Sequence, residues 1–262
     1  MKITKKHLAP AALMGLLAFA PSAAMALDPA GPTYLPNNHG KSLTTPVAWG
    51  ASGNVLFMGV GGDYPAPYTD SADGAAILGF GFGDPKKDFG IQVAIASLDI
   101  TEWKEYSAYV QLHKNLGNGN AIAIGVENVM LTDGGDADKS FYVVYSQGLQ
   151  ADSFVDQKTG NSKLHFSIGA GSGRFGDKSP EDIADGKGKH GTYVFGNIAY
   201  DVSDSFNLIA DWNGLNLNAG ISKTFWLTKK VPLAITIGAA DLTKNSGDGV
   251  RLIAAAGVAF KL

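Results

Sequence analysis

Cysteine is absent from all 262 positions of the sequence. Its absence excludes a disulfide framework, a thiolate metal site and a lipid anchor attached to a cysteine at a signal-peptidase site. Charged residues are also scarce, at 17%. The sequence is rich instead in glycine, with 34 residues, and in aromatic residues, at 10%. This composition favours an all-β chain over a helical one.

The longest apolar run, Ala11–Ala20, is far shorter than the ~20 residues that a membrane-spanning helix needs. Three lysines precede it among the first six residues, Pro21 ends it, and Ala24-Met25-Ala26 follows with the small-x-small pattern of a cleavage site. We therefore predict a signal peptide over residues 1–26, cleaved after Ala26, and export of the mature chain.

Positive charge is in the minority. The chain has 21 basic and 24 acidic residues, and three of the lysines belong to the predicted signal peptide, which carries no acid. The mature chain is left with 18 basic against 24 acidic residues, a net charge of −6. Because nucleic-acid binding needs a basic footprint, we expect no nucleic-acid partner.

Past residue 53 the apolar residues alternate with a period of two, in segments of about ten residues separated by turn-forming residues. The clearest examples are 215–222, 163–170 and 89–95, each with large apolar residues on one face only. This pattern predicts an antiparallel transmembrane β-barrel of about twelve strands. We expect strands near 54–61, 73–82, 88–97, 105–114, 119–128, 139–147, 162–170, 191–200, 204–212, 214–224, 231–240 and 250–262.

Short and long connections alternate along these strands, as they do in outer-membrane barrels with both termini in the periplasm. Long polar loops are expected on the extracellular side, at 62–72, 129–138, 171–190 and 241–249. Two connections break the alternation: 148–161 is long, and the tight Trp212-Asn213-Gly214 link is a type I′ hairpin signal. Aromatic residues gather near the expected periplasmic ends, where membrane barrels place them at the interface.

The two predicted faces of the strands differ in side-chain size. A soluble β-sandwich would also alternate, but its core face would carry large side chains. Here the expected inner face is dominated by small residues and the other face carries the large apolar ones, as contact with lipid requires. The small inner residues are Gly79, Gly81, Ala94, Ala96, Ala121, Ala123, Gly125, Gly169, Gly238, Ala255, Gly257 and Ala259.

The two ends of the mature chain carry different signals. Residues 27–53 are rich in Pro, Gly and Asn without a period, and are expected either as a loose periplasmic lead-in or as a plug folded into the lumen. The barrel is expected over 54–262. Its last strand places Leu252, Phe260 and Leu262 on one face, which resembles the C-terminal signal that the barrel-assembly machinery recognises; we therefore expect that machinery and outer-membrane lipid as partners.

Polar residues on the inner face are the candidate site. We expect them to line a channel, to satisfy one another across a wet interior and to tolerate charge, so that Asn218→Arg would be accepted. Both charge signs occur, so no ring of one sign predicts an ion filter. The expected lumen-lining residues are Gln92, Tyr109, Gln111, His113, Glu127, Lys163, His165, Asp211, Asn216, Asn218 and Arg251.

Three motifs bear on the question of other chemistry. His165 and Ser167 share a strand face, as the catalytic pair does in outer-membrane phospholipases, but the Asn-Gly that follows the serine in that family is replaced by Ile168-Gly169. The string 133–138 alternates carboxylates with glycine but lacks the full calcium-loop pattern. The glycine run 171–176 lacks the following helix of a phosphate loop. We expect no catalytic residues, no metal and no cofactor.

One stretch carries a further resemblance. Ile209-Ala-Asp-Trp-Asn-Gly214, Leu217-Asn-Ala-Gly-Ile221 and the hairpin strand Leu233–Leu242 resemble the repeated hairpins of the YjbH-like outer-membrane barrels associated with exopolysaccharide production. The resemblance covers about a sixth of the chain. It implies a role at the outer membrane in polysaccharide export or envelope maintenance.

These features together predict an exported, non-enzymatic protein of the bacterial outer membrane. The expected function is a channel or envelope barrel for small solutes or glycans, working by diffusion through the lumen. The alternatives are a lipid-modifying enzyme, which would need Ser167, and a surface protein that binds a partner through its 171–190 loop.

Overall fold

The computed structural model describes residues 41–133, 139–157, 160–203, 205–228 and 230–262. The predicted signal peptide, residues 27–40 and most of the 133–138 string lie outside this part. Among the described residues, no helix is long and apolar enough to cross a membrane.

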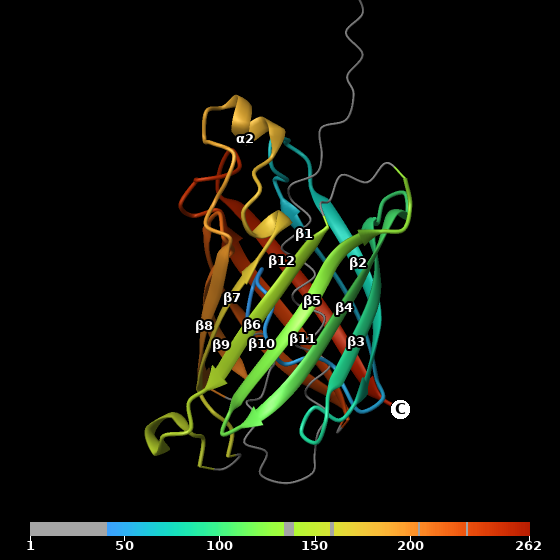
Figure 1. Cartoon of the computed structure of the whole chain (residues 1–262), viewed down its shortest axis with the longest axis vertical. Coiled ribbons are helices and arrows are strands. Elements are labelled where there is room, and N and C mark those ends of the chain that lie inside the picture. Colours follow the sequence, from blue (N-terminus) through green and yellow to red (C-terminus); the bar gives the residue numbers. More distant parts are fainter. Residues whose placement is uncertain (1–40, 134–138, 158–159, 204, 229) are drawn as a thin grey trace, which may run out of the picture.

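The described residues form a closed antiparallel β-barrel of twelve strands, in which every strand pairs with its sequence neighbours and β1 also pairs with β12 (Figure 1). This confirms the predicted fold, and each strand begins and ends within four residues of its predicted bounds. The strands are β1 (Val55–Tyr64), β2 (Asp73–Gly83), β3 (Gly90–Asp99), β4 (Lys104–Gly117), β5 (Asn120–Met130), β6 (Ser140–Gly148), β7 (Leu164–Gly171), β8 (Val194–Ser203), β9 (Phe206–Trp212), β10 (Leu217–Thr228), β11 (Val231–Ala240) and β12 (Arg251–Lys261).

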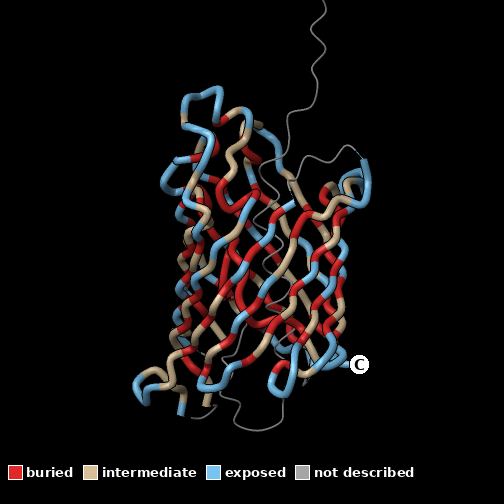
Figure 2. The backbone as a smooth tube through the Cα atoms, in the orientation of Figure 1, coloured by how far each residue is buried: buried red, intermediate tan, exposed pale blue. Residues whose placement is uncertain are grey.

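Burial alternates along the strands, as the buried and exposed colours do in Figure 2. On β3, Ala94 and Ala96 are buried while Val93 and Ile95 are exposed. Exposed apolar side chains recur on strands all around the barrel, such as Leu78, Ile124, Ile168, Ile198, Leu208, Ile237 and Leu252. A closed barrel with an outward apolar surface and a polar interior is the architecture of outer-membrane barrels, and the soluble sandwich does not fit it.

The two ends of the barrel differ. One end, here called the loop end, carries the long connection between β7 and β8, with the 3-10 helix η4 (Gly173–Phe175) and α2 (Pro180–Ala184) (Figure 1). The other, the turn end, carries the C-terminus and the link between β6 and β7, with η3 (Asp152–Phe154). The long 149–163 link and the tight turn at Asn213–Gly214 are therefore both present, at the ends where the sequence places them.

Candidate functional site

Residues 41–53, here called the lumen segment, lie inside the barrel as far as Ala51 and leave it at the turn end. Every residue from Lys41 to Ala51 is buried. The segment joins β1 through Gly53 and Asn54, both with positive φ, and the Gly53 N–H donates to the Gly83 carbonyl at the turn end. Residues 27–40 are outside the described part, so the bounds of the predicted lead-in remain a prediction.

Asp211 on β9 is the main anchor of the lumen segment. Its Oδ2 accepts hydrogen bonds from the backbone N–H groups of Leu43 and Thr44, at 2.9 and 2.7 Å, and from the Ser42 hydroxyl at 3.3 Å. Its Oδ1 accepts from the Thr44 hydroxyl at 3.0 Å and from the Asn218 side-chain amide at 2.7 Å. A buried carboxylate needs such donors to offset the loss of water.

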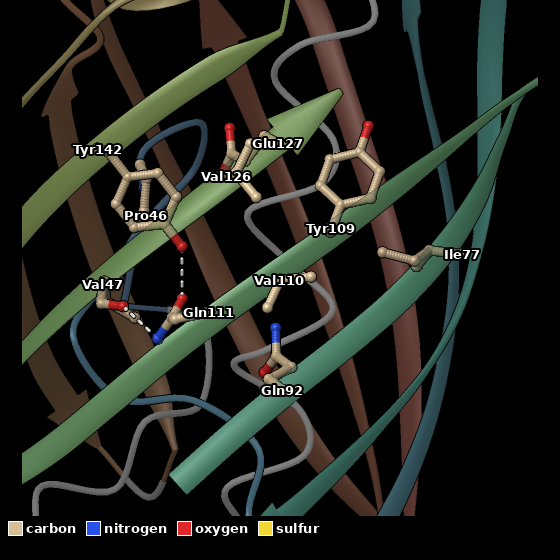
Figure 3. Close-up of a pocket in the computed structure, with 10 residues that line it drawn as sticks. All are labelled: Pro46, Val47, Ile77, Gln92, Tyr109, Val110, Gln111, Val126, Glu127 and Tyr142. Carbon is tan, nitrogen blue, oxygen red and sulfur yellow. Dashed lines mark hydrogen bonds between the residues drawn. The ribbon is translucent and has the colours of Figure 1, made fainter. Parts of the chain in front are cut away.

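The opposite wall holds the second half of the segment. The Gln111 amide donates to the Val47 carbonyl at 3.2 Å, and the Tyr142 hydroxyl donates to Gln111 at 2.8 Å (Figure 3). The Ala48 N–H donates to the Ser146 hydroxyl at 2.8 Å and the Ala51 N–H to Gln92 Oε1 at 2.7 Å. Side chains thus satisfy the backbone of a segment that has no strand partner.

Small residues make room for this packing. A Cβ at Gly81 would collide with the backbone of Ala51, and a Cβ at Gly50 would lie 2.6 Å from the His113 ring. What remains open beside Val47 is a small cavity with room for about one water molecule (Figure 3). The expectation of a lumen kept open by small side chains is therefore wrong for this conformation, because those side chains accommodate the lumen segment.

The 172–193 connection fills the lumen from the loop end. Arg174 Nε is 2.6 Å from Glu127 Oε2, and its Nη1 donates to the Thr44 carbonyl at 2.9 Å. Phe175 is fully buried and stacks on Phe195, with ring centroids 4.3 Å apart. The sequence predicts 171–190 as an extracellular loop at the mouth of the barrel, but residues 173–175 of this loop are buried, because Gly171 and Gly214 leave room for Phe175.

Gly214 explains why this inward turn is compatible with the tight hairpin between β9 and β10. Its φ is +99°, and a Cβ there would collide with the Phe175 carbonyl. The Asn-Gly turn found in the sequence therefore has a second role, as the surface on which the buried part of the 172–193 connection lies.

Ten of the eleven residues expected in the lumen are buried there: Gln92, Tyr109, Gln111, His113, Glu127, His165, Asp211, Asn216, Asn218 and Arg251. Lys163 is different, since it lies just before β7 and is only half-buried. The structure brings Asp211 and Asn218 together, and Arg251 pairs with Asp63 and with Asp241, at 2.6 Å for the latter. A channel-lining role for these residues remains a prediction.

The expected tolerance of Asn218→Arg is not supported by this packing. Asn218 is fully buried; its amide nitrogen donates to Thr44 and Asp211, and its oxygen accepts from the Asp241 N–H. An arginine would displace the lumen segment rather than face water.

His165 and Ser167 are not hydrogen-bonded to each other in the described part of the structure. Ser167 Oγ is 2.7 Å from Ser146 Oγ, and neither ring nitrogen of His165 has a hydrogen-bond partner among the described residues. Both are buried inside the barrel, where the His165 ring meets Trp49 edge to face at 5.9 Å. They lie on the lumen side of the wall, as their strand parity predicts.

Sequence reasoning missed five buried charged residues in the described part of the chain, and two of them, Asp63 and Asp241, pair with Arg251. Lys41 is buried beside Asn207 and lies 3.5 Å from Asp201; Arg174 pairs with Glu127; and Asp182 holds the loop end together. Each of these last three lies in a Gly- or Pro-rich stretch without a period, so no local pattern separates it from a solvated loop. One signal was available in the sequence. Glu127 is predicted to face inward, and an inward carboxylate implies a cation as its partner, although the sequence does not identify that cation.

Asp182, at the start of α2, joins three loops. It accepts hydrogen bonds from the Ser246 hydroxyl, from the Gly247 N–H at 2.8 Å and from the Tyr68 hydroxyl at 2.6 Å. Lys187 lies 3.4 Å away and also donates to the Gly247 carbonyl at 2.7 Å. The loops 65–72, 172–193 and 241–250 are thereby fastened together as a cap at the loop end.

The pKa of Asp182 should make this cap insensitive to mild acid. Burial raises the pKa, but hydrogen bonds from Ser246, Tyr68 and Gly247 and the charge of Lys187 outweigh it and hold the pKa below its ordinary value. A carboxyl with a depressed pKa in the folded state stabilises that state fully above its unfolded pKa of about 4, and loses this effect as the pH falls through the lower folded value. The cap should therefore persist from pH 7 to pH 5.

Asp182→Asn should loosen the cap even at pH 7. The loss of acceptors leaves buried donors without hydrogen bonds, which costs about 1–3 kcal/mol of stability. Hydrogen exchange of the amides of α2 should therefore accelerate about ten- to a hundredfold. Asp185→Asn is the matched control, because Asp185 is exposed and lies 3.3 Å from the same lysine; its effect should be under threefold. Equal acceleration in both variants would contradict the role given to Asp182.

Solved structures that are similar to this chain include outer-membrane β-barrels. No family model and no curated protein matches this sequence. The KdgM porin in complex with disordered oligogalacturonate is 10% identical, with a TM-score of 0.46 over 79% of this chain and 99% of that chain. Outer membrane phospholipase A from Escherichia coli is 10% identical, with a TM-score of 0.40 over 79% and 96%. Omp33 from Acinetobacter baumannii is 9% identical, with a TM-score of 0.42 over 80% and 98%.

Proposed function

We propose that the protein is an outer-membrane channel for small polar solutes, short glycans among them, and that the lumen segment closes it. One observation carries the proposal: the barrel wall leaves enough room to bury a whole polypeptide segment, residues 41–51. A barrel whose own side chains filled its interior would hold no such segment. A lumen of this width also fits an extended solute chain of similar thickness.

The chemistry of the wall supports a polar solute. The lumen segment is held mainly by hydrogen bonds to side chains of the wall. Asp211 on one wall and Gln92 and Ser146 on the other accept hydrogen bonds from it, and Gln111 donates one to it. Once the segment leaves, these groups need water or a solute that donates and accepts hydrogen bonds, because an unsatisfied buried polar group costs about 1–3 kcal/mol. An apolar solute would leave them all unpaired.

The proposal includes three more specific points, on the role of the channel, its assembly partner and the absence of an enzymatic activity. The resemblance of the 209–242 hairpins to YjbH-like barrels would place the channel in polysaccharide export or envelope maintenance. Recognition of β12 by the barrel-assembly machinery would bring the chain to its membrane. The absence of an enzymatic activity is the third, and Ser167→Ala should leave the protein's function unchanged.

Planar-bilayer recording of the mature protein, from residue 27, tests the proposal. The full mature chain should be nearly silent, and deletion of residues 27–53 should produce stable ion conductance, because water then fills the lumen. Both proteins must first show the β-sheet circular dichroism and heat-dependent gel mobility of a folded barrel. Silence from a folded deletion variant would refute the channel and favour a surface or enzymatic role.

A further inference from the structure

Asp211 differs from the other carboxylates buried in the described part of the chain. Five are buried: Asp63, Glu127, Asp182, Asp211 and Asp241. Four of them lie within 4.0 Å of an arginine or lysine nitrogen. Asp211 has no such cation among the described residues, and only neutral N–H and O–H groups surround it.

Almost all of these neutral donors come from the lumen segment rather than from the barrel. Of the five hydrogen bonds that Asp211 accepts from the described residues, four come from Ser42, Leu43 and Thr44, and one comes from Asn218 of the wall. If the segment leaves, the Asp211 carboxylate still has four acceptor positions, but the wall supplies only one donor to it, the Asn218 amide. Asp211 is thus a hydrogen-bond acceptor of the barrel wall that loses most of its donors when the lumen segment leaves.

Apart from Asp201 on β8, which lies opposite Asn207 and 3.5 Å from Lys41, the wall beside Asp211 has the same neutral polar character. Asn197, Asn207 and Ser222, on β8, β9 and β10, are buried on this side of the lumen. The Asn197 amide donates to the Lys41 carbonyl, while its oxygen has no hydrogen-bond partner among the described residues. Amides and hydroxyls both donate and accept, as do the hydroxyls of a sugar.

We propose that Asp211 and Asn218 form a binding subsite for a neutral polyhydroxylated solute, such as a glycan, and that residues 42–44 occupy this subsite in the closed state. The inference rests on the proposed channel function, since the segment must leave for the solute to enter. Adjacent hydroxyls of one sugar replace the adjacent N–H and O–H donors of the segment on the two carboxylate oxygens. Solute and segment therefore compete, and solute binding favours the open channel.

The test uses the full mature chain with a weakened lumen segment. Lys41→Met/Thr44→Val, the loosened variant, removes the Lys41 contacts with Asn207 and Asp201 and the Thr44 hydroxyl that faces Asp211. It leaves Asp211 and Asn218 unchanged. Binding of maltohexaose, a neutral linear oligosaccharide, is measured by titration calorimetry, which does not depend on ion conduction.

The loosened variant should bind maltohexaose at least tenfold more tightly than the unaltered mature protein, because the segment no longer competes as well. Adding Asp211→Ala to it should weaken binding at least tenfold, and the isosteric Asp211→Asn should weaken it in the same direction if the alanine variant misfolds. Thr224→Val, on β10, is the matched control in the lumen wall, because the Thr224 hydroxyl is buried without a hydrogen-bond partner among the described residues; it should change the affinity less than twofold.

The subsite would be overturned by the absence of binding to a folded loosened variant, or by equal affinity with and without the Asp211 carboxylate. Binding of a cationic chito-oligosaccharide alone would show that the carboxylate selects charge rather than hydroxyls, and would also overturn it. Failure of the proposed channel function would give a different result. A folded barrel without residues 27–53 would then pass no current, while calorimetry would still measure whether maltohexaose binding depends on Asp211.

Discussion

Arg174→Met should destabilise the folded barrel by about 3–5 kcal/mol, because it leaves Glu127 as a buried charge without a partner. The two side chains are 3% and 8% exposed and their closest atoms are 2.6 Å apart. The same change removes the donor to the Thr44 carbonyl, so it should also weaken the hold on the lumen segment. Equilibrium unfolding in guanidinium, followed by tryptophan fluorescence, measures the loss.

The double variant Arg174→Met/Glu127→Leu separates the charge from the packing. Replacing both members of a buried ion pair by apolar groups is often neutral, so most of the lost stability should return. A single-variant loss below about 1 kcal/mol would mean that Arg174 reaches solvent in the folded protein and that the loop-end filling of the lumen is not as described.

The sequence predicts the barrel wall well because a strand's two faces are encoded locally. Val93 and Ile95 alternate with Ala94 and Ala96, and no distant contact is needed to know which pair meets lipid. The inward position of Asp211 follows from the same parity. The alternation of residues along each strand therefore predicts both the barrel wall and most of the polar residues that face the lumen.

The filling of the lumen could not be predicted in this way. Leu43 and Thr44 meet Asp211 across 168 and 167 positions of the sequence, and the lumen segment has no period that would reveal a buried face. Its Pro, Gly and Asn are as typical of a loose lead-in as of a plug. Arg174 was hidden for the same reason, inside a glycine run that resembles an exposed loop.

The absence of cysteine offers a way to fix the lumen segment reversibly. Ala48 on the segment and Ser146 on β6 are neighbours, with the Ala48 nitrogen 2.8 Å from the Ser146 hydroxyl. In Ala48→Cys/Ser146→Cys the two new cysteines can pair only with each other within one chain. Built into the loosened variant, this pair forms a lock whose opening depends on the redox state alone.

Single-channel current of this locked, loosened variant tests the central claim, that residues 41–53 close a channel. Under oxidising conditions the disulfide holds the segment against β6, and the barrel should be silent. Addition of dithiothreitol to the same bilayer should start ion conductance, while the loosened variant without the cysteines should conduct at similar levels before and after the addition. A locked barrel whose current is the same in both redox states, whether conducting or silent, would contradict the claim.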